Sequence, residues 1–234
     1  DTLLIQTAIH ADETPVKVIQ EDREKCYMWV YCSGADSPDD TQANKNIVLY
    51  DYQPSRAASC PINYLGGYKG FLQVDGYAGY ESTNAMLVGC MAHARRKFID
   101  AQKAQLKGKS GRADWAVSHI QKLYKIEAQL KTKTNAERFE IRKDLSVPLL
   151  NEFKAWLDKT VAHVVPKSAI GAAVSYTLNQ WQKLIAYTQD GQLSIDNNRA
   201  ERAIKPFVIG RKNWLFSNTA SGANASANLY SVIE

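Results

Sequence analysis

Three carboxylates stand where a rigid backbone could hold them while a ligand still reaches them. Asp12 interrupts the apolar pattern of "IHADET", Asp75 follows the strand-like "GFLQV" and precedes a glycine, and Glu201 lies in the helix-like "NNRAERAIKP". An acid inside a strand pattern is costly to bury unless a cation accompanies it. Carboxylate oxygens are the ligands that hard divalent cations prefer. If the three side chains face one point, they form an oxygen-only metal site.

Such a site predicts phosphodiester chemistry. Two ions about 3.5 to 4 Å apart can activate a water or a 3′-hydroxyl and stabilise the leaving oxygen of an in-line displacement. Hydrolytic cutting and strand transfer use the same site and differ only in the nucleophile. The sequence has no visible Cys or Ser nucleophile with a partnered His, and no GxxxxGK[ST] loop.

Each acid also has a simpler interpretation. Asp75 before glycine is, taken alone, more typical of a turn residue. Glu13 competes with Asp12 and points to the opposite face of the strand. Glu201 could pair with Lys205 at the favourable four-residue helical spacing. These alternatives stay open, whereas Asp196 is predicted to be the N-cap of the helix that carries Glu201.

Cations near the acids fit a phosphodiester substrate, which Lys and Arg must hold. Trp214 is predicted to stack on a base. Asn197 and Asn198 share the helical face of Glu201, so we expect them to support the metal ligands or to contact DNA. The predicted DNA-binding residues are Arg95, Arg96, Lys97, Arg199, Arg202, Lys205, Arg211, Lys212 and Trp214.

Charge is unevenly distributed along the 234 residues, whose net charge is +5. Residues 1–60 hold 5 Lys or Arg against 10 Asp or Glu, whereas residues 91–145 hold 14 against 6. A basic middle indicates a surface for a polyanion, although a solvated helical face gives the same pattern. No secretory signal or membrane-length apolar run is present, so we expect a cytoplasmic protein without a membrane partner.

The cysteines favour buried free thiols over disulfides. Cys90 and His93 form a Cys-x-x-His pair, but no second pair lies at the spacing of a zinc finger. The chain begins close to a strand-like run without an initiator Met, so we expect it to be part of a longer protein.

Strands dominate the first ninety residues, in "AIHADETPVKVIQ", "CYMWVYCS", "NIVLYDYQ" and "GFLQVDGY", before any convincing helix. A short strand at "AMLVGCM" leads into the helical "AHARRKFIDAQKAQ". Helical spacing alone continues from Gly111 to Asp190. After Asp196 a short helix is expected to stop at Pro206, followed by an extended "FVIGRKNWLFS" and a final helix. The predicted α/β core is therefore 1–105 and 192–234, with a helical insertion at 106–191.

These residues resemble the transposases of the insertion-sequence 66 family, which belong to the DDE superfamily and have a ribonuclease-H-like core. The resemblance rests on "HADETPV", "GFLQVDGYAGY", "GCMAHARRKF", "IDNNRAERAIKPFVIGRKNWLFS" and "SGANASANLYSVIE", which span nearly the whole chain in the family's order. It implies a mixed sheet flanked by helices, with an all-helical insertion between the second Asp and the Glu of the triad.

The resemblance also implies that Asp12, Asp75 and Glu201 are the catalytic and metal-binding triad, separated here by 63 and 126 residues. Two Mg²⁺ or Mn²⁺ ions and DNA, as transposon ends and as target, are the expected cofactors and partner. The need to pair two element ends predicts a homodimer or larger assembly on DNA.

Two rival interpretations belong to different classes of protein. A metal-dependent nuclease of the same fold would cut without joining. A non-catalytic DNA-binding or assembly remnant would use the acids only structurally. A glycosidase with a carboxylate pair is disfavoured by the basic surroundings.

Overall fold

The computed structural model describes residues 2–34, 46–104 and 111–234. By contact, these residues form two compact units: 2–34, 46–87 and 197–234 make up the first, and 88–104 with 111–196 make up the second. We call them the sheet unit and the helical unit. In the described part of the chain, no helix combines the length and the apolar character needed to cross a membrane.

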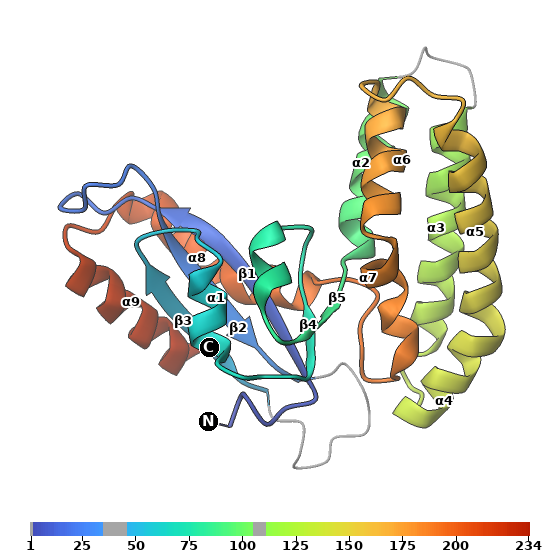
Figure 1. The fold of residues 1–234 in the computed structure, drawn as a ribbon. Coiled ribbons are helices and arrows are strands. Elements are labelled where there is room, and N and C mark those ends of the chain that lie inside the picture. Colours follow the sequence, from blue (N-terminus) through green and yellow to red (C-terminus); the bar gives the residue numbers. More distant parts are fainter. Residues whose placement is uncertain (1, 35–45, 105–110) are drawn as a thin grey trace. The chain divides into compact units, whose positions relative to one another are not determined.

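The sheet is mixed and, in the described residues, five-stranded, in the order β3-β2-β1-β4-β5 (Figure 1). β2 pairs antiparallel with both β1 and β3, and β1 pairs parallel with β4. The strands are β1 (Ala8–Val16), β2 (Cys26–Cys32), β3 (Val48–Gln53), β4 (Phe71–Gln73) and β5 (Met86–Val88). This architecture confirms the predicted mixed α/β fold of the ribonuclease-H-like class.

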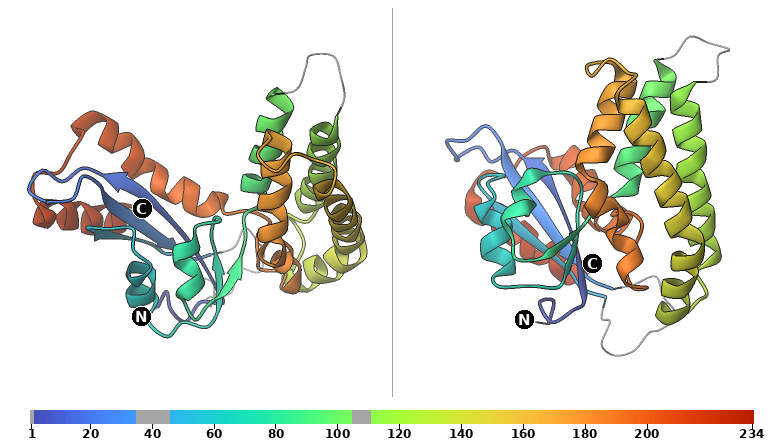
Figure 2. Two further views of the ribbon diagram at one scale, coloured as in Figure 1. Left: turned by 45° about the horizontal axis from the view of Figure 1, so that its top comes forward. Right: turned by 45° about the vertical axis from the view of Figure 1, so that its right-hand side comes forward.

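Helices cover both faces of this sheet (Figure 2). On one face, α8 (Asn198–Trp214) packs on β1 and β2, and α9 (Ala220–Ile233) packs on β3. The opposite face carries α1 (Ser59–Leu65) and the short 3₁₀ helix η1 (Ala78–Ser82). Because both faces of β2 are covered, its side chains alternate between two cores: Met28 and Val30 enter the core with α8 and α9, whereas Trp29 and Tyr31 enter the core with α1 and η1.

The helical unit is built around α2, α3, α5 and α6, each of which packs against two of the others within residues 88–104 and 111–196 (Figure 1). Stacked aromatic side chains fill its core, with the rings of Trp115 and Trp156 centred 4.6 Å apart. Its helices are α2 (Met91–Lys103), α3 (Arg112–Gln129), α4 (Asn135–Ile141), the π-helix η2 (Arg142–Ser146), α5 (Val147–Val161), α6 (Ala169–Asn179), α7 (Trp181–Ile185) and the 3₁₀ helix η3 (Ala186–Gln189).

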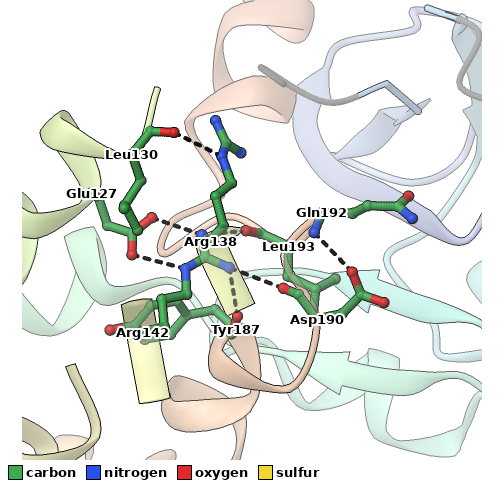
Figure 3. A network of polar contacts seen from close by, with 8 residues as sticks. All are labelled: Glu127, Leu130, Arg138, Arg142, Tyr187, Asp190, Gln192 and Leu193. Carbon is green, nitrogen blue, oxygen red and sulfur yellow. Dashed lines mark hydrogen bonds and ion pairs between the residues drawn. The ribbon is translucent and has the colours of Figure 1, made fainter. Parts of the chain in front are cut away.

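A buried arginine ties this unit together (Figure 3). The guanidinium of Arg142 donates to both carboxylate oxygens of Glu127, at 3.0 and 2.7 Å. It also donates to three backbone carbonyls, those of Tyr187, Asp190 and Leu193, at 2.8 to 2.9 Å. One side chain from η2 thus fixes both α3 and the segment that leaves the helical unit.

Three expectations about local structure were wrong. α1 lies between β3 and β4, where only strands were expected. The helix α8 does not stop at Pro206 but continues to Trp214, so "FVIGRKNW" is helical and not extended. Ile204 and Phe207 are both buried against the sheet, and this packing on either side of Pro206 outweighs the missing proline N–H.

The N-cap of α8 is Asn197 and not Asp196. Asp196 Oδ2 instead accepts a hydrogen bond from the hydroxyl of Tyr124 at 2.9 Å. All four cysteines are free and buried, as expected. The predicted boundary at residue 105 lies outside the described residues, and the predicted domain limits stay a prediction. The prediction assigns α2 to the core, whereas in the structure α2 packs against α3 and α6.

Candidate active site

Asp12 lies in the middle of β1, on the face that α8 covers. It stands opposite Val30, which belongs to the core under α8, and paired residues on neighbouring strands share a face. Its Oδ1 accepts a hydrogen bond from the N–H of Glu13 at 2.9 Å. Burial raises the pKa of Asp12 to about 7, and the charge of Glu13 adds to the rise. The charges of Asp75 and Glu201 also raise this pKa, so both carboxylates lie within electrostatic range of Asp12.

Asp75 follows β4 by two residues. The parallel pairing of β1 with β4 ends at His10 and Gln73, and Asp12 and Asp75 each follow this last pair by two residues. Its Oδ1 accepts from the N–H of Tyr77 at 2.8 Å, which makes Asp75 a turn residue as well. Its second oxygen makes no hydrogen bond within the described parts of the chain. The turn therefore orients the carboxylate without occupying it.

Glu201 lies in the first turn of α8 and is half-buried. Ala200, Ile204 and Phe207 mark the buried stripe of this helix, so Glu201 stands at the edge of the packed face. That position lets a carboxylate reach the sheet while its helix remains anchored in the core.

Asn197 pins the start of α8 to β1. Its Nδ2 donates to the carbonyl of Ala11 at 2.8 Å, and its Oδ1 lies 3.2 Å from Nδ1 of His10. Because an amide oxygen only accepts, Nδ1 of His10 must carry the proton. Sequence reasoning missed His10, although its position two residues before Asp12 on a strand predicts the same face. A supporting role for Asn197 and the half-buried Asn198 stays a prediction.

Glu13 has separate partners on the other face of the sheet. Its carboxylate is 1% exposed and accepts hydrogen bonds from Arg56 and from the hydroxyl of Tyr80. Burial raises the pKa of Glu13, and the bonds from Tyr80 and Arg56 oppose that rise. Sequence reasoning missed Arg56, and no local pattern links it to Glu13, which lies 43 residues away.

The predicted DNA contacts on α8 differ in their surroundings. Arg202, Lys205 and Lys212 are exposed. Arg199 is half-buried and donates to the carbonyl of Ser33 at 2.8 Å.

The last part of α8 carries two further predicted contacts. Arg211 donates from Nη1 to the hydroxyl of Thr14 at 2.9 Å. Trp214 packs edge-on against Phe207, with ring centres 5.5 Å apart, and is partly buried. Both side chains therefore have structural partners in the sheet unit.

A second group of predicted DNA contacts belongs to α2 of the helical unit. Arg96 and Lys97 are exposed. The ammonium of Lys97 lies 4.7 Å above the ring of Tyr176, and Arg95 donates to Gln121 at 3.4 Å. Their action on the same substrate as the acids stays a prediction.

Comparison with known proteins now identifies the family. Residues 1–225 match the transposase IS66 family. The uncharacterized proteins y4hP and y4qI of Sinorhizobium fredii (strain NBRC 101917 / NGR234) are 31% and 30% identical over 96% and 97% of this chain. The match covers 44% of each of them, so the chain spans less than half the length of these relatives. No solved structure is significantly similar to it. The chain belongs to the IS66 family of transposases.

Proposed function

We propose that this chain carries the catalytic core of a DDE transposase, with Asp12, Asp75 and Glu201 as its metal ligands and DNA as its substrate. The observation that supports this proposal is that the charges of Asp75, in a turn, and of Glu201, on a helix, both act on Asp12 in its strand. Like charges that act on one another favour a bound cation, and the oxygen-only donors suit Mg²⁺ or Mn²⁺. Two bound ions would supply the charge that activates an attacking oxygen and stabilises a leaving oxygen.

The chain's own residues would hold and orient this chemistry. Asp12 must lose its proton before it can bind a cation, and its raised pKa makes that step sensitive to pH near neutrality. Asp75 is oriented by its turn, and Asn197 fixes the helix that carries Glu201. In the proposed sequence of reactions, water first cuts DNA at the element end, and the freed 3′-hydroxyl then attacks target DNA.

DNA is proposed to lie along the exposed cations of α8, namely Arg202, Lys205 and Lys212. The remaining predicted contacts, including those on α2, belong to the same proposal. The catalytic core is proposed to comprise residues 1–105 and 192–234, with 106–191 as the insertion. A homodimer or larger assembly is expected on paired ends.

The experiment that tests this proposal supplies a pre-cut transposon-end duplex, a supercoiled plasmid and Mg²⁺. Joined products are expected with the wild-type chain and should disappear in Asp12→Asn, Asp75→Asn and Glu201→Gln. Asp22→Asn is the matched control, because Asp22 is exposed in the turn between β1 and β2. It should join DNA as the wild type does.

Other outcomes separate the rivals. Metal-dependent cutting without joined products would identify a nuclease of the same fold. DNA binding that is unchanged in the three variants, with no cutting by any chain, would identify a non-catalytic module.

A further inference from the structure

Arg56 lies between β3 and α1 and is held by a buried acid. Its Nε donates to Oε1 of Glu13 at 2.6 Å, and its Nη2 contacts the same oxygen. The hydroxyl of Tyr80 donates to Oε2 of Glu13, also at 2.6 Å. The Glu13 side chain is 1% exposed, whereas that of Arg56 is 41% exposed. The acid is therefore enclosed, and the cation on it reaches solvent.

A tyrosine fixes the plane of the Arg56 guanidinium. The guanidinium carbon lies 3.9 Å from the centre of the Tyr77 ring, and the Tyr77 hydroxyl donates to the Arg56 carbonyl. The Tyr77 ring in turn meets the Tyr80 ring edge-on, with centres 5.8 Å apart. Arg56 is thus fixed by a carboxylate at one edge and by an aromatic ring at one face.

One edge of this guanidinium remains available. Nη1 makes no hydrogen bond within residues 2–34, 46–104 and 111–234. A planar fork with an open donor edge is suited to a phosphate oxygen, and its fixed orientation lowers the entropy lost on binding.

Of the three proposed metal ligands, Asp75 is the one linked to this site. The N–H of Tyr77 donates to Asp75, and the charge of Asp75 acts on the Arg56 guanidinium. Burial acts to lower the pKa of Arg56, but the charge and hydrogen bond of Glu13, followed by the charge of Asp75, outweigh it. The net effect raises this pKa and keeps the guanidinium charged.

We propose that Arg56 binds a backbone phosphate of the DNA substrate on the Asp75 side of the proposed site, with Glu13, Tyr77 and Tyr80 as its positioning residues. This inference rests on the proposed function, because it takes DNA as the substrate. A purely structural ion pair is the competing interpretation, and it predicts no effect of Arg56 on DNA binding once the fold is intact.

Equilibrium binding tests the proposal with a fluorescein-labelled duplex from the end of the encoding element, over a series of salt concentrations and with Ca²⁺ in place of Mg²⁺. Arg56→Gln should weaken binding roughly tenfold, and loss of one phosphate contact should reduce the slope of log K against log salt by about 0.9. Arg56→Lys should lose part of the affinity, because an ammonium lacks the planar fork. The control Arg23→Gln, at an exposed position of the sheet unit, should bind as the wild type does.

A second variant guards against misfolding. Arg56→Gln leaves Glu13 buried without its cation, so the double variant Glu13→Gln/Arg56→Gln removes both charges. Wild-type affinity and salt slope in the folded double variant would overturn the proposal, and so would absence of DNA binding by the wild-type chain.

The joining assay keeps the two proposals apart. A double variant that joins and binds DNA normally would refute the role of Arg56 alone. Weakened binding by Arg56 variants of a chain that never cuts would support Arg56 and refute the catalytic function.

Discussion

Asp12 is a single residue whose environment opposes its own ionisation. Its pKa is raised from 3.8 to about 7, so between these values the folded chain holds a proton that the unfolded chain has lost. The contribution of Asp12 to stability is therefore greatest below about pH 4 and falls as pH rises towards 7. Without divalent metal, Asp12→Asn should raise the free energy of unfolding at pH 8 by up to about 4 kcal/mol.

Urea denaturation at several pH values measures this effect. The difference between Asp12→Asn and wild type should vanish below about pH 3, where Asp12 is neutral in both the folded and the unfolded chain. Added Mg²⁺ should stabilise the wild type more at pH 8 than at pH 5, because binding requires the carboxylate. A difference between the two chains that does not change with pH would contradict this account.

In the helical unit, Arg142 forms a buried ion pair with Glu127, and its side chain is 1% exposed. Arg142→Met leaves Glu127 and three carbonyls without their donor, so we expect a loss of about 3 to 5 kcal/mol in the free energy of unfolding. The neighbouring Lys143→Met, at an exposed position, is the control and should change stability little. Part of the loss should be recovered in Glu127→Gln/Arg142→Met, since that change removes the unpaired acid. Equal stability of the two single variants in urea would contradict this role.

At the scale of elements, α8 shows where local sequence rules lose to packing. Pro206 predicted a helix end, yet the helix continues because residues on both sides of it are buried on the sheet. Pro206→Ala restores a backbone donor inside the helix, so the free energy of unfolding should rise by about 1 to 3 kcal/mol. Thermal denaturation of the variant and the wild type measures this increase in stability. If the helix stopped at Pro206, the substitution would not increase the stability.

The strands were predictable because apolar and β-branched residues mark them, and so were the long helices of the insertion, through their spacing. α1 was not, because seven residues containing Pro61 are too few to show a helical period. The prediction that Asp196 is the N-cap of α8 was also wrong. Asp196 accepts a hydrogen bond from Tyr124, which lies 72 residues away and is not visible from the local sequence.

The three acids were predicted from residue type, local pattern and family resemblance, and their role as metal ligands stays a prediction. The ion pair of Glu13 with Arg56 joins distant segments and left no local pattern. Side-chain partners chosen by tertiary packing therefore account for most of what the sequence did not reveal.

At the scale of the whole molecule, the helical unit begins and ends at one place. The N–H of Met91 donates to the carbonyl of Ile195 at 3.0 Å, and that of Gly89 to Lys183 at 2.8 Å. Adjacent ends are typical of an inserted domain. We expect a fragment of residues 88–196 to fold alone, with helical circular dichroism and a cooperative thermal transition.

A fragment of residues 106–191 provides the comparison, because it lacks α2, which packs on both α3 and α6. It should melt without cooperativity. If the shorter fragment folds as well as the longer one, α2 belongs with the sheet unit.

The position of α8 and α9 has a consequence for synthesis of the chain. These helices cover one face of the sheet, yet they follow the 109 residues of Val88–Asp196. At ribosomal speed, those residues take roughly 5 to 20 s to make. Throughout that interval the nascent sheet exposes Met28, Val30 and Tyr50 and lacks Glu201. The growing polypeptide therefore needs protection from aggregation, and it cannot bring Glu201 to the sheet before translation of this part of the gene is nearly complete.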